Sequence, residues 1–318
     1  MIRQREKSKP MNNFTNKVYI ASKDQAEYAS LINNAQLEDL VITQDKSLAN
    51  IVLADPPLIV NDLPNLPKLE WLQSTFAGVD ALVVSGLRQD YELTNVKGIF
   101  GQQISEYVVG NTIEYFRHFS TYRQQQLKSQ WQPHPYQSLA DKSILVLGTG
   151  DIGCHVAKVC NALGMKTGGV NRTGIPAKAS PFKYTFHIGE FKSAVKDADI
   201  IVSTLPSTPD TRGYLNAARL AHADNALLFS VGRGDVLVEE DLIPAIENGN
   251  IAHAFLDVFE QEPLPKSSPF WSHDKVSVTP HIAAVSFPHQ VFEQFKENYL
   301  RWYDGFKLQN RVDFKKGY

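Results

Sequence analysis

Residues 142–174 read KSILVLGTGDIGCHVAKVCNALGMKTGGVNRTG, and this stretch decides the fold. An apolar run at 144–147 stops at three glycines spaced G-x-G-x-x-G, and a helical segment follows. This layout predicts a strand–turn–helix–strand unit around a nucleotide pyrophosphate, with the anion at the helix N-terminus. The residues of this turn predicted to bind the cofactor are Gly148, Gly150, Asp151, Ile152 and Gly153, of which Gly150 lets the backbone approach the phosphates.

The end of the next apolar run indicates which nucleotide is bound. NAD-binding units place an acidic residue there to accept from the ribose 2′-hydroxyl, whereas this chain has Asn171, Arg172 and Thr173. A guanidinium and a hydroxyl suit a 2′-phosphate, and no carboxylate repels it. The sequence therefore predicts NADP(H) as the preferred cofactor, with NAD(H) possible. The alternative is that Arg172 is a solvated surface arginine.

Working outward, apolar runs alternate with helical patterns along the chain, which predicts an α/β fold with mainly parallel sheets. Six strands of a doubly wound Rossmann sheet are expected at 144–147, 166–170, 199–204, 226–231, 253–257 and 276–279. Residues 105–286 are predicted as this Rossmann domain. Residues 11–104 with 287–318 are predicted as a smaller, discontinuous, flavodoxin-like substrate domain. Helices at 105–126 and 287–306 are expected to connect the two, and residues 1–10 are expected to be a loose tail.

Composition excludes several classes of protein. The 318 residues are 43% hydrophobic and 21% charged, and the net charge of −2 gives no field that would recruit nucleic acid. No apolar run is long enough to span a membrane, and no secretory signal is present. The cysteines, Cys154 and Cys160, fall on one predicted helix and are not expected to pair, which favours a reducing, cytoplasmic location. No histidine has metal-ligand spacing, so no metal site is expected.

Three segments at predicted strand ends supply a cation, a carboxylate and an imidazole. They contain Arg233 in SVGRGD, Glu262 in DVFEQEPLP and His281 in TPHIAA. A guanidinium can bind the carboxylate and keto oxygen of a 2-keto acid, and an imidazolium can protonate that oxygen as hydride arrives. Each residue alone has a structural explanation, as a turn arginine, a solvated loop glutamate or a core histidine. Their occurrence at successive strand ends favours a catalytic site.

The motifs LGTGDIG, LPSTPDTR, VGRGDVLVEEDL, FLDVFEQEPLP and VTPHIAA, in this order, resemble those of the D-isomer-specific 2-hydroxyacid dehydrogenase family. The resemblance covers most of residues 100–286, and QSTFAGVD at 73–80 extends it more loosely. Within the family, the likeness is closest to NADPH-preferring glyoxylate/hydroxypyruvate reductases. The departure from NAD-dependent members is the Asn171-Arg172-Thr173 segment.

The resemblance implies roles for individual residues. Arg233 matches the substrate-orienting arginine, His281 the acid/base, and Glu262, rather than Glu260, its paired carboxylate. Backbone N–H groups of Phe76, Ala77, Gly78 and Val79 match a carboxylate-binding loop. Further cofactor contacts are implied at Ser105, Leu205, Pro206, Thr211, Val231, Gly232, Arg233, Asp257, His281 and Ala283. A homodimer is also implied, with Trp131 at a subunit contact.

These inferences predict an NADPH-dependent reductase of small 2-keto acids, glyoxylate and hydroxypyruvate first, that forms D-2-hydroxy acids with His281 as the acid. One alternative is an NAD(P)-sensing binding protein that keeps the fold and acts through partners. Another is a D-2-hydroxyacid dehydrogenase for a bulkier substrate. If the protein binds NADPH tightly but does not oxidise it with any member of a panel of 2-keto acids, the sensing protein would be favoured.

Overall fold

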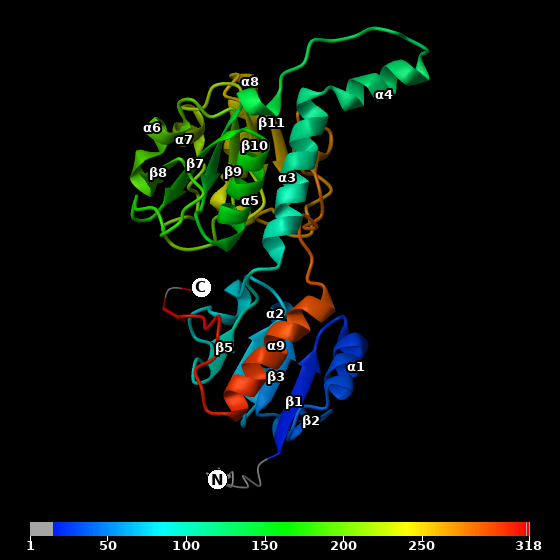
Figure 1. Cartoon of the computed structure of the whole chain (residues 1–318), viewed down its shortest axis with the longest axis vertical. Helices are drawn as coiled ribbons and strands as arrows, with labels where there is room; N and C mark the ends of the chain where they lie inside the picture. Colours follow the sequence, from blue (N-terminus) through cyan, green and yellow to red (C-terminus); the bar gives the residue numbers. More distant parts are fainter. Residues whose placement is uncertain (1–14, 316, 318) are drawn as a thin grey trace, which may run out of the picture. The chain divides into compact units, whose positions relative to one another are not determined.

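The computed structural model describes residues 15–315 and 317, so the predicted tail at 1–10 and the predicted domain start at residue 11 lie outside the described residues. The chain divides into two compact units (Figure 1). Unit 1 runs to Val96 and resumes at Ser286, and unit 2 is Lys97–Val285. The chain passes from unit 1 to unit 2 after Val96, eight residues before the predicted boundary at 104. It returns to unit 1 after Val285, one residue before the predicted boundary at 286. The first differs because the helix expected to begin at Ser105 begins at Phe100 and belongs to unit 2.

Unit 1 is built on a five-stranded parallel sheet in the order β2-β1-β3-β4-β5, which is the flavodoxin-like order. Its strands are β1 (Asn16–Ala21), β2 (Leu40–Ile42), β3 (Ile51–Ala54), β4 (Trp71–Ser74) and β5 (Glu92–Thr94). Its helices are α1 (Gln25–Ala35), α2 (Pro56–Ile59) and α9 (Pro288–Tyr303). The Trp71 ring stacks on Phe295 of α9 at 5.2 Å, which fixes this late helix on the early sheet, as predicted.

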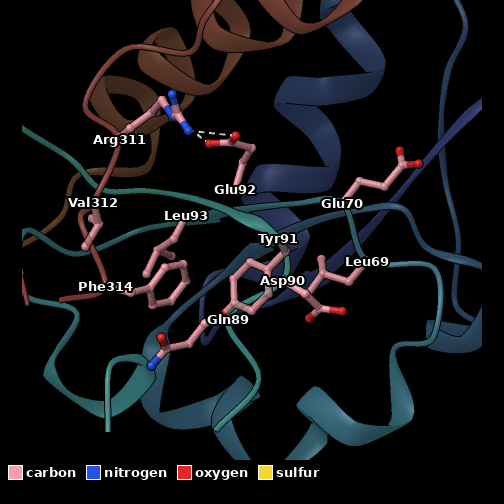
Figure 2. A pocket seen from close by; sticks show the side chains of 10 residues that line it. All are labelled: Leu69, Glu70, Gln89, Asp90, Tyr91, Glu92, Leu93, Arg311, Val312 and Phe314. Carbon is pink, nitrogen blue, oxygen red and sulfur yellow. Dashed lines mark hydrogen bonds and ion pairs between the residues drawn. The ribbon is translucent and has the colours of Figure 1, made fainter. Parts of the chain in front are cut away.

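The C-terminal segment of unit 1 covers the edge strand β5. Val312 N–H donates to the Leu93 carbonyl at 2.8 Å, and Arg311 pairs with Glu92, Nη2 to Oε1, at 2.8 Å. A hollow of about 450 Å³ remains beside this contact (Figure 2), and none of the predicted site residues lines it. The segment protects an exposed sheet edge from pairing with other chains.

Unit 2 contains a seven-stranded parallel sheet in the order β12-β11-β10-β9-β6-β7-β8. Its strands are β6 (Ser143–Leu147), β7 (Lys166–Asn171), β8 (Tyr184–His187), β9 (Ile200–Ser203), β10 (Ala226–Ser230), β11 (Ile251–Leu256) and β12 (Val276–Val278). Its helices are α3 (Phe100–Phe116), α4 (Phe119–Leu127), α5 (Asp151–Ala162), α6 (Phe191–Val195), α7 (Ala217–Leu220) and α8 (Glu239–Glu247). With β6 as strand 1, the order is the doubly wound one, extended by β12.

The predicted Rossmann fold is therefore confirmed, but the six strands predicted for it did not include β8. In the sheet of unit 1, β2 and β5 were not predicted. β8 reads YTFH and is an edge strand that pairs only with β7, so it lacks the continuous apolar run that marks a strand buried on both faces. β2 and β5 are three-residue strands, too short to show a periodic pattern.

The predicted helix at 105–126 is two helices. His118 adopts a left-handed conformation with φ 55°, which breaks the chain direction between α3 and α4. α3 packs against α5, whereas α4 and the loop after it extend away from the rest of unit 2 (Figure 1). Trp131, in that loop, is 99% exposed within this single chain.

Side chains of the central strands of unit 2 alternate between two buried clusters, one on each sheet face. One face is covered by α6, α7 and α8, and the other by α3 and α5. Among the described residues, no helix is both long and apolar enough to cross a membrane.

Candidate active site

The glycine turn between β6 and α5 has the geometry predicted for phosphate binding. Gly148 has φ 102°, a conformation that favours glycine. A Cβ atom at Gly153 would lie 1.9 Å from the Gly148 carbonyl oxygen, so only glycine allows this approach of helix to strand. A Cβ atom at Gly150 would meet nothing within 4 Å, which leaves open space at the first turn of the helix. Asp151, the first residue of α5, accepts from the Gly98 N–H at 2.9 Å.

Gly153→Ala and Gly150→Ala form a matched pair with opposite expected results. Gly153→Ala is expected to lower the free energy of unfolding by about 3 kcal/mol, because an overpacked core position must displace backbone. Gly150→Ala is expected to leave the Tm of the cofactor-free protein unchanged and to weaken binding of the cofactor NADPH. Thermal unfolding and a fluorescence titration with NADPH measure both. Equal Tm values for the two variants would contradict this reading of the turn.

The loop after β7 is organised by Asn171. Its side-chain amide donates to Thr149 Oγ1 and to the Ile175 carbonyl, each at 3.0 Å. Its oxygen accepts from the backbone N–H groups of Thr173 at 3.0 Å and Gly174 at 2.7 Å. Asn171 therefore shapes the loop, and the residue that follows it, Arg172, is exposed.

Four of the predicted cofactor contacts, Leu205, Pro206, Thr211 and Val231, lie in the loops after β9 and β10. Thr211 is buried, and its hydroxyl donates to the Pro206 carbonyl at 2.5 Å and accepts from the Thr208 N–H at 2.9 Å, so it fixes the loop. Leu205 and Val231 are also buried. Ser105 is 1% exposed and bonds to the Gly101 carbonyl at 2.6 Å and to His155 Nδ1 at 2.9 Å. These contacts lie within and between α3 and α5, and a cofactor contact of Ser105 stays a prediction.

Arg233 lies on a loop that is clamped by its two neighbours. A Cβ atom at Gly232 would lie 2.5 Å from the Leu205 carbonyl oxygen, and one at Gly234 would lie 1.9 Å from the Phe259 carbonyl carbon. Both glycines therefore pack backbone against backbone, which joins the loops after β9, β10 and β11. The G-R-G sequence fixes the arginine between those loops, and its Nη1 donates to the Gly232 carbonyl at 2.8 Å.

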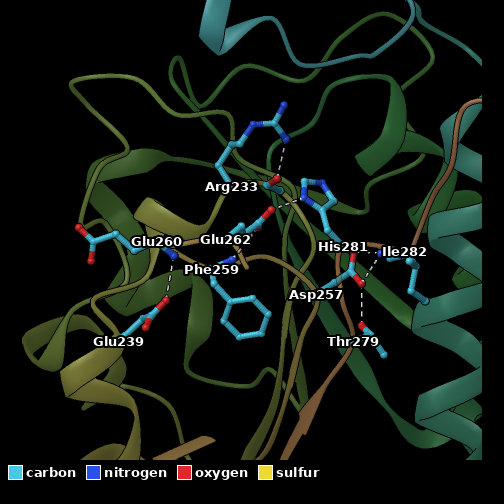
Figure 3. Close-up of polar contacts among 11 residues, drawn as sticks. Arg233, Glu239, Asp257, Phe259, Glu260, Glu262, Thr279, His281 and Ile282 are labelled. Atoms are coloured by element: carbon cyan, nitrogen blue, oxygen red, sulfur yellow. Dashed lines mark hydrogen bonds and ion pairs between the residues drawn. The ribbon is translucent and has the colours of Figure 1, made fainter. Parts of the chain in front are cut away.

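The turn that carries His281 is wrapped around the buried carboxylate of Asp257, at the end of β11. One carboxylate oxygen accepts from the Thr279 hydroxyl at 2.6 Å and the Ile282 N–H at 2.8 Å, and the other accepts from the Ala283 N–H at 2.9 Å (Figure 3). His281 has φ 54°, an uncommon backbone conformation that this network holds in place. Asp257 thus positions the turn, a role that the sequence analysis missed.

His281 and Glu262 form the central pair of the site. His281 Nδ1 lies 2.8 Å from Glu262 Oε2, and Glu262 Oε1 accepts from the Phe259 N–H at 3.0 Å (Figure 3). Glu260 points away from the histidine, and its N–H donates to Glu239 Oε1 at 2.8 Å. The resemblance implied Glu262, rather than Glu260, as the partner of His281, and Glu262 is the one within hydrogen-bond distance. Figure 3 shows Arg233 beside this pair.

The pair changes the proton affinity of both groups. The hydrogen bond that His281 donates to Glu262 raises the pKa of His281 above the ordinary histidine value, against the opposing effect of burial. Burial acts to raise the pKa of Glu262, but the hydrogen bonds from His281 and the Phe259 N–H outweigh it and hold that pKa below its ordinary value. The pair is therefore suited to carry a protonated imidazole next to an ionised carboxylate.

The loop after β4 in unit 1 is a separate anion-binding candidate. Its carbonyls are engaged, since Phe76 O accepts from the Val96 N–H at 3.2 Å and Ala77 O accepts from Asn95 Nδ2 at 2.7 Å. The Phe76 N–H donates to Ser74 Oγ at 3.0 Å, and a substrate contact of this N–H stays a prediction. Within residues 15–315 and 317, the N–H groups of Ala77, Gly78 and Val79 have no hydrogen-bond partner.

Comparison with known proteins identifies the family. Residues 109–283 match the model of the "D-isomer specific 2-hydroxyacid dehydrogenase, NAD binding domain". The chain is 34% identical over 267 residues to glyoxylate/hydroxypyruvate reductase A of Serratia proteamaculans (strain 568), covering 80% of this chain and 84% of the relative. The chain belongs to the D-isomer-specific 2-hydroxyacid dehydrogenase family.

Solved structures agree with this assignment over nearly the full length of the dehydrogenase. A family member from Aeromonas salmonicida subsp. salmonicida A449 is 40% identical with a TM-score of 0.89, covering 94% of this chain and 99% of that one. A member from Xanthobacter autotrophicus Py2, crystallised with NADPH and MES, is 31% identical with a TM-score of 0.86, covering 96% and 100%. The predicted family and α/β fold are confirmed.

The glycine turn of the dehydrogenase fits the nicotinamide cofactor that its family binds. It combines open space at Gly150 with a helix start whose backbone N–H groups precede the first helical hydrogen bond, from Cys154 to Gly150. Among the described residues, no group of three or more metal-ligating side chains is assembled. Cys154 and Cys160 are both free thiols.

Proposed function

We propose that this dehydrogenase reduces small 2-keto acids, first glyoxylate and hydroxypyruvate, to D-2-hydroxy acids with NADPH. The observation that carries the proposal is the 2.8 Å contact between His281 and Glu262, at strand ends that also hold Arg233. The name of the Serratia relative, a glyoxylate/hydroxypyruvate reductase, supports this substrate class.

The residues act on the substrate as follows. An ionised carboxylate only accepts, so the His281 proton that bonds Glu262 lies on Nδ1, and Nε2 is left to face the substrate. The His281 Nε2 proton passes to the keto oxygen, which becomes the hydroxyl. The Arg233 guanidinium binds the substrate carboxylate and stabilises negative charge on that oxygen. Bound NADPH supplies the hydride to the keto carbon. The free N–H groups of Ala77, Gly78 and Val79 are proposed to bind a carboxylate.

The proposal is tested by NADPH consumption over glyoxylate, hydroxypyruvate, pyruvate and bulkier keto acids. The highest kcat/KM is expected with glyoxylate and hydroxypyruvate. A preference for a bulky keto acid would replace the substrate assignment. Tight NADPH binding without turnover on any member of the panel would instead support a cofactor-sensing protein.

NADPH is proposed over NADH because the loop after β7 carries an exposed arginine, Arg172, and a hydroxyl, Thr173, where NAD-binding units place a carboxylate that would repel a 2′-phosphate. The NADPH complex of the Xanthobacter relative supports this choice. Steady-state kinetics with both cofactors tests it. An equal or higher kcat/KM with NADH would overturn the preference.

The rate of reduction is expected to fall as pH rises through the raised pKa of His281, because only the protonated ring can donate. Glu262→Gln removes the carboxylate that raises this pKa, so the decline is expected at lower pH than in the wild type. Glu260→Gln, two residues away and pointing elsewhere, is the matched control and should keep the wild-type profile. A pH–rate profile of Glu262→Gln that overlays the wild type would refute the assigned pair.

A homodimer is proposed through α4 and the loop that follows it. Leu127 is 80% exposed and Trp131 is 99% exposed, so this extension carries large apolar side chains without cover in the single chain. Sedimentation velocity is expected to show a dimer for the wild type and a larger monomer fraction for Trp131→Glu. A wild-type monomer would overturn this part of the proposal.

A further inference from the structure

His281 lies in the segment 279–285, and Gln103 of α3 holds the C-terminal end of this segment. Gln103 Nε2 donates to the Val285 carbonyl at 3.0 Å, and the Val285 N–H donates to Gln103 Oε1 at 2.9 Å. One side-chain amide thus satisfies both backbone groups of Val285, as a neighbouring strand would. Val285 is the last residue of unit 2, so this pair fixes the end of the segment.

The near end of the segment is held by Tyr107, also on α3. The Tyr107 hydroxyl lies 2.8 Å from Thr279 Oγ1, and Thr279 Oγ1 lies 2.6 Å from Asp257 Oδ1. The Asp257 carboxylate accepts three hydrogen bonds, so the single Thr279 proton points to it and Tyr107 must donate to Thr279. Burial raises the pKa of Tyr107 to about 12, which keeps that donor proton in place. The Tyr107 ring also packs edge-on against Phe229 of β10, at 6.4 Å.

Gln103 and Tyr107 are four residues apart on α3 and therefore project from the same face of the helix. Their contacts, Thr279 and Val285, flank His281 on either side. Between them His281 sits in a left-handed conformation that is unfavourable unless its surroundings hold it.

We propose that Gln103 and Tyr107 are positioning residues for catalysis. Through these two side chains, helix α3 holds the 279–285 segment at both ends and so maintains the hydrogen bond between His281 and Glu262. This inference rests on the proposed function of His281 as the acid. Three charged groups act on the ring, namely the carboxylates of Glu262 and Asp257 and the guanidinium of Arg233. The hydrogen bond to Glu262 has the largest effect on the pKa of His281. If the segment loosens, this hydrogen bond is the contact that weakens.

The test compares Tyr107→Phe and Gln103→Met with matched controls on the same helix. Tyr115→Phe removes a hydroxyl from a ring that packs near Phe116 and His253, and Gln102→Met removes an amide that reaches only Glu106 on the helix surface. Both substitutions at 103 and 107 preserve side-chain volume, so Tm is expected to change little. The first readout is kcat with glyoxylate and the KM for NADPH. The second is the titration of the His281 ring protons by NMR, assigned by their loss in His281→Asn.

Tyr107→Phe and Gln103→Met are each expected to lower kcat about tenfold with the KM for NADPH unchanged, because small displacements of a catalytic group reduce turnover strongly. In both variants the pKa of His281 is expected to fall toward its ordinary value, whereas both controls should match the wild type. If kcat and the His281 titration stay at wild-type values, the inference is wrong. A lower kcat with an unchanged titration also overturns it, since the ring would then still be held. The NMR titration needs no substrate, so a wild type that fails to turn over keto acids refutes the proposed function and leaves this test valid.

Discussion

Replacing His281 by asparagine is expected to lower kcat about 10²- to 10⁴-fold, which is the usual contribution of a positioned general acid. Asparagine is chosen because it tolerates the left-handed backbone that His281 adopts at φ 54° and cannot donate a proton as imidazolium does. The affinity for NADPH is expected to change little, because the acid acts on the keto oxygen in the transition state.

Cofactor titration and thermal unfolding are the controls for His281→Asn. The backbone of the turn is held by Asp257 through Thr279, Ile282 and Ala283 and does not depend on the imidazole, so Tm should stay close to the wild type. A variant that turns over within threefold of the wild type would show that another group protonates the substrate. A variant that loses kcat only in proportion to lost NADPH binding would point to a structural role.

Most strands of unit 2 could be predicted from the sequence, including β12 at one edge of the sheet, but β8 at the other edge could not. The strands from β6 to β12 other than β8 end within two residues of their predicted ends. The prediction missed β8 because this edge strand has no continuous apolar run. It missed the break between α3 and α4 because His118 carries no glycine-like signal for a left-handed residue. Helical periodicity on both sides of residue 118 therefore read as one helix.

In the site, the sequence indicated the side chains proposed to react but not the hydrogen bonds that hold them in place. The contact between Glu262 and His281 could be predicted from the resemblance of their motifs to those of the family, and the two side chains lie 2.8 Å apart. The roles of Asp257 and Thr279 in shaping the turn depend on hydrogen bonds that span 22 or more residues, which no local pattern encodes. The Phe76 N–H lies in the implied carboxylate-binding loop, but the Ser74 hydroxyl, only two residues away, accepts from it. Backbone donors can be assigned only once the loop conformation is known.

Replacing Arg233 by glutamine is expected to lower kcat/KM for keto acids about 10²- to 10³-fold, comparable with the loss of one oxyanion-stabilising donor. Part of the loss should appear in the KM for the keto acid, because the same guanidinium is proposed to bind the substrate carboxylate. The KM for NADPH should rise less. Arg233→Lys restores the charge but not the planar fork, so it is expected to recover only part of the activity.

Arg212 provides the matched control for Arg233. It lies in unit 2 with its side chain 71% exposed and pairs with Asp235, Nε to Oδ2, at 3.1 Å. Arg212→Gln also removes one positive charge, so a general electrostatic effect would lower kcat/KM in both variants. Because Arg233 is fixed between the loops after β9 and β11 by the close packing of Gly232 and Gly234, its effect should be local and far larger. Similar losses in the two variants would mean that the arginine attracts the anionic substrate through its field alone and does not contact it.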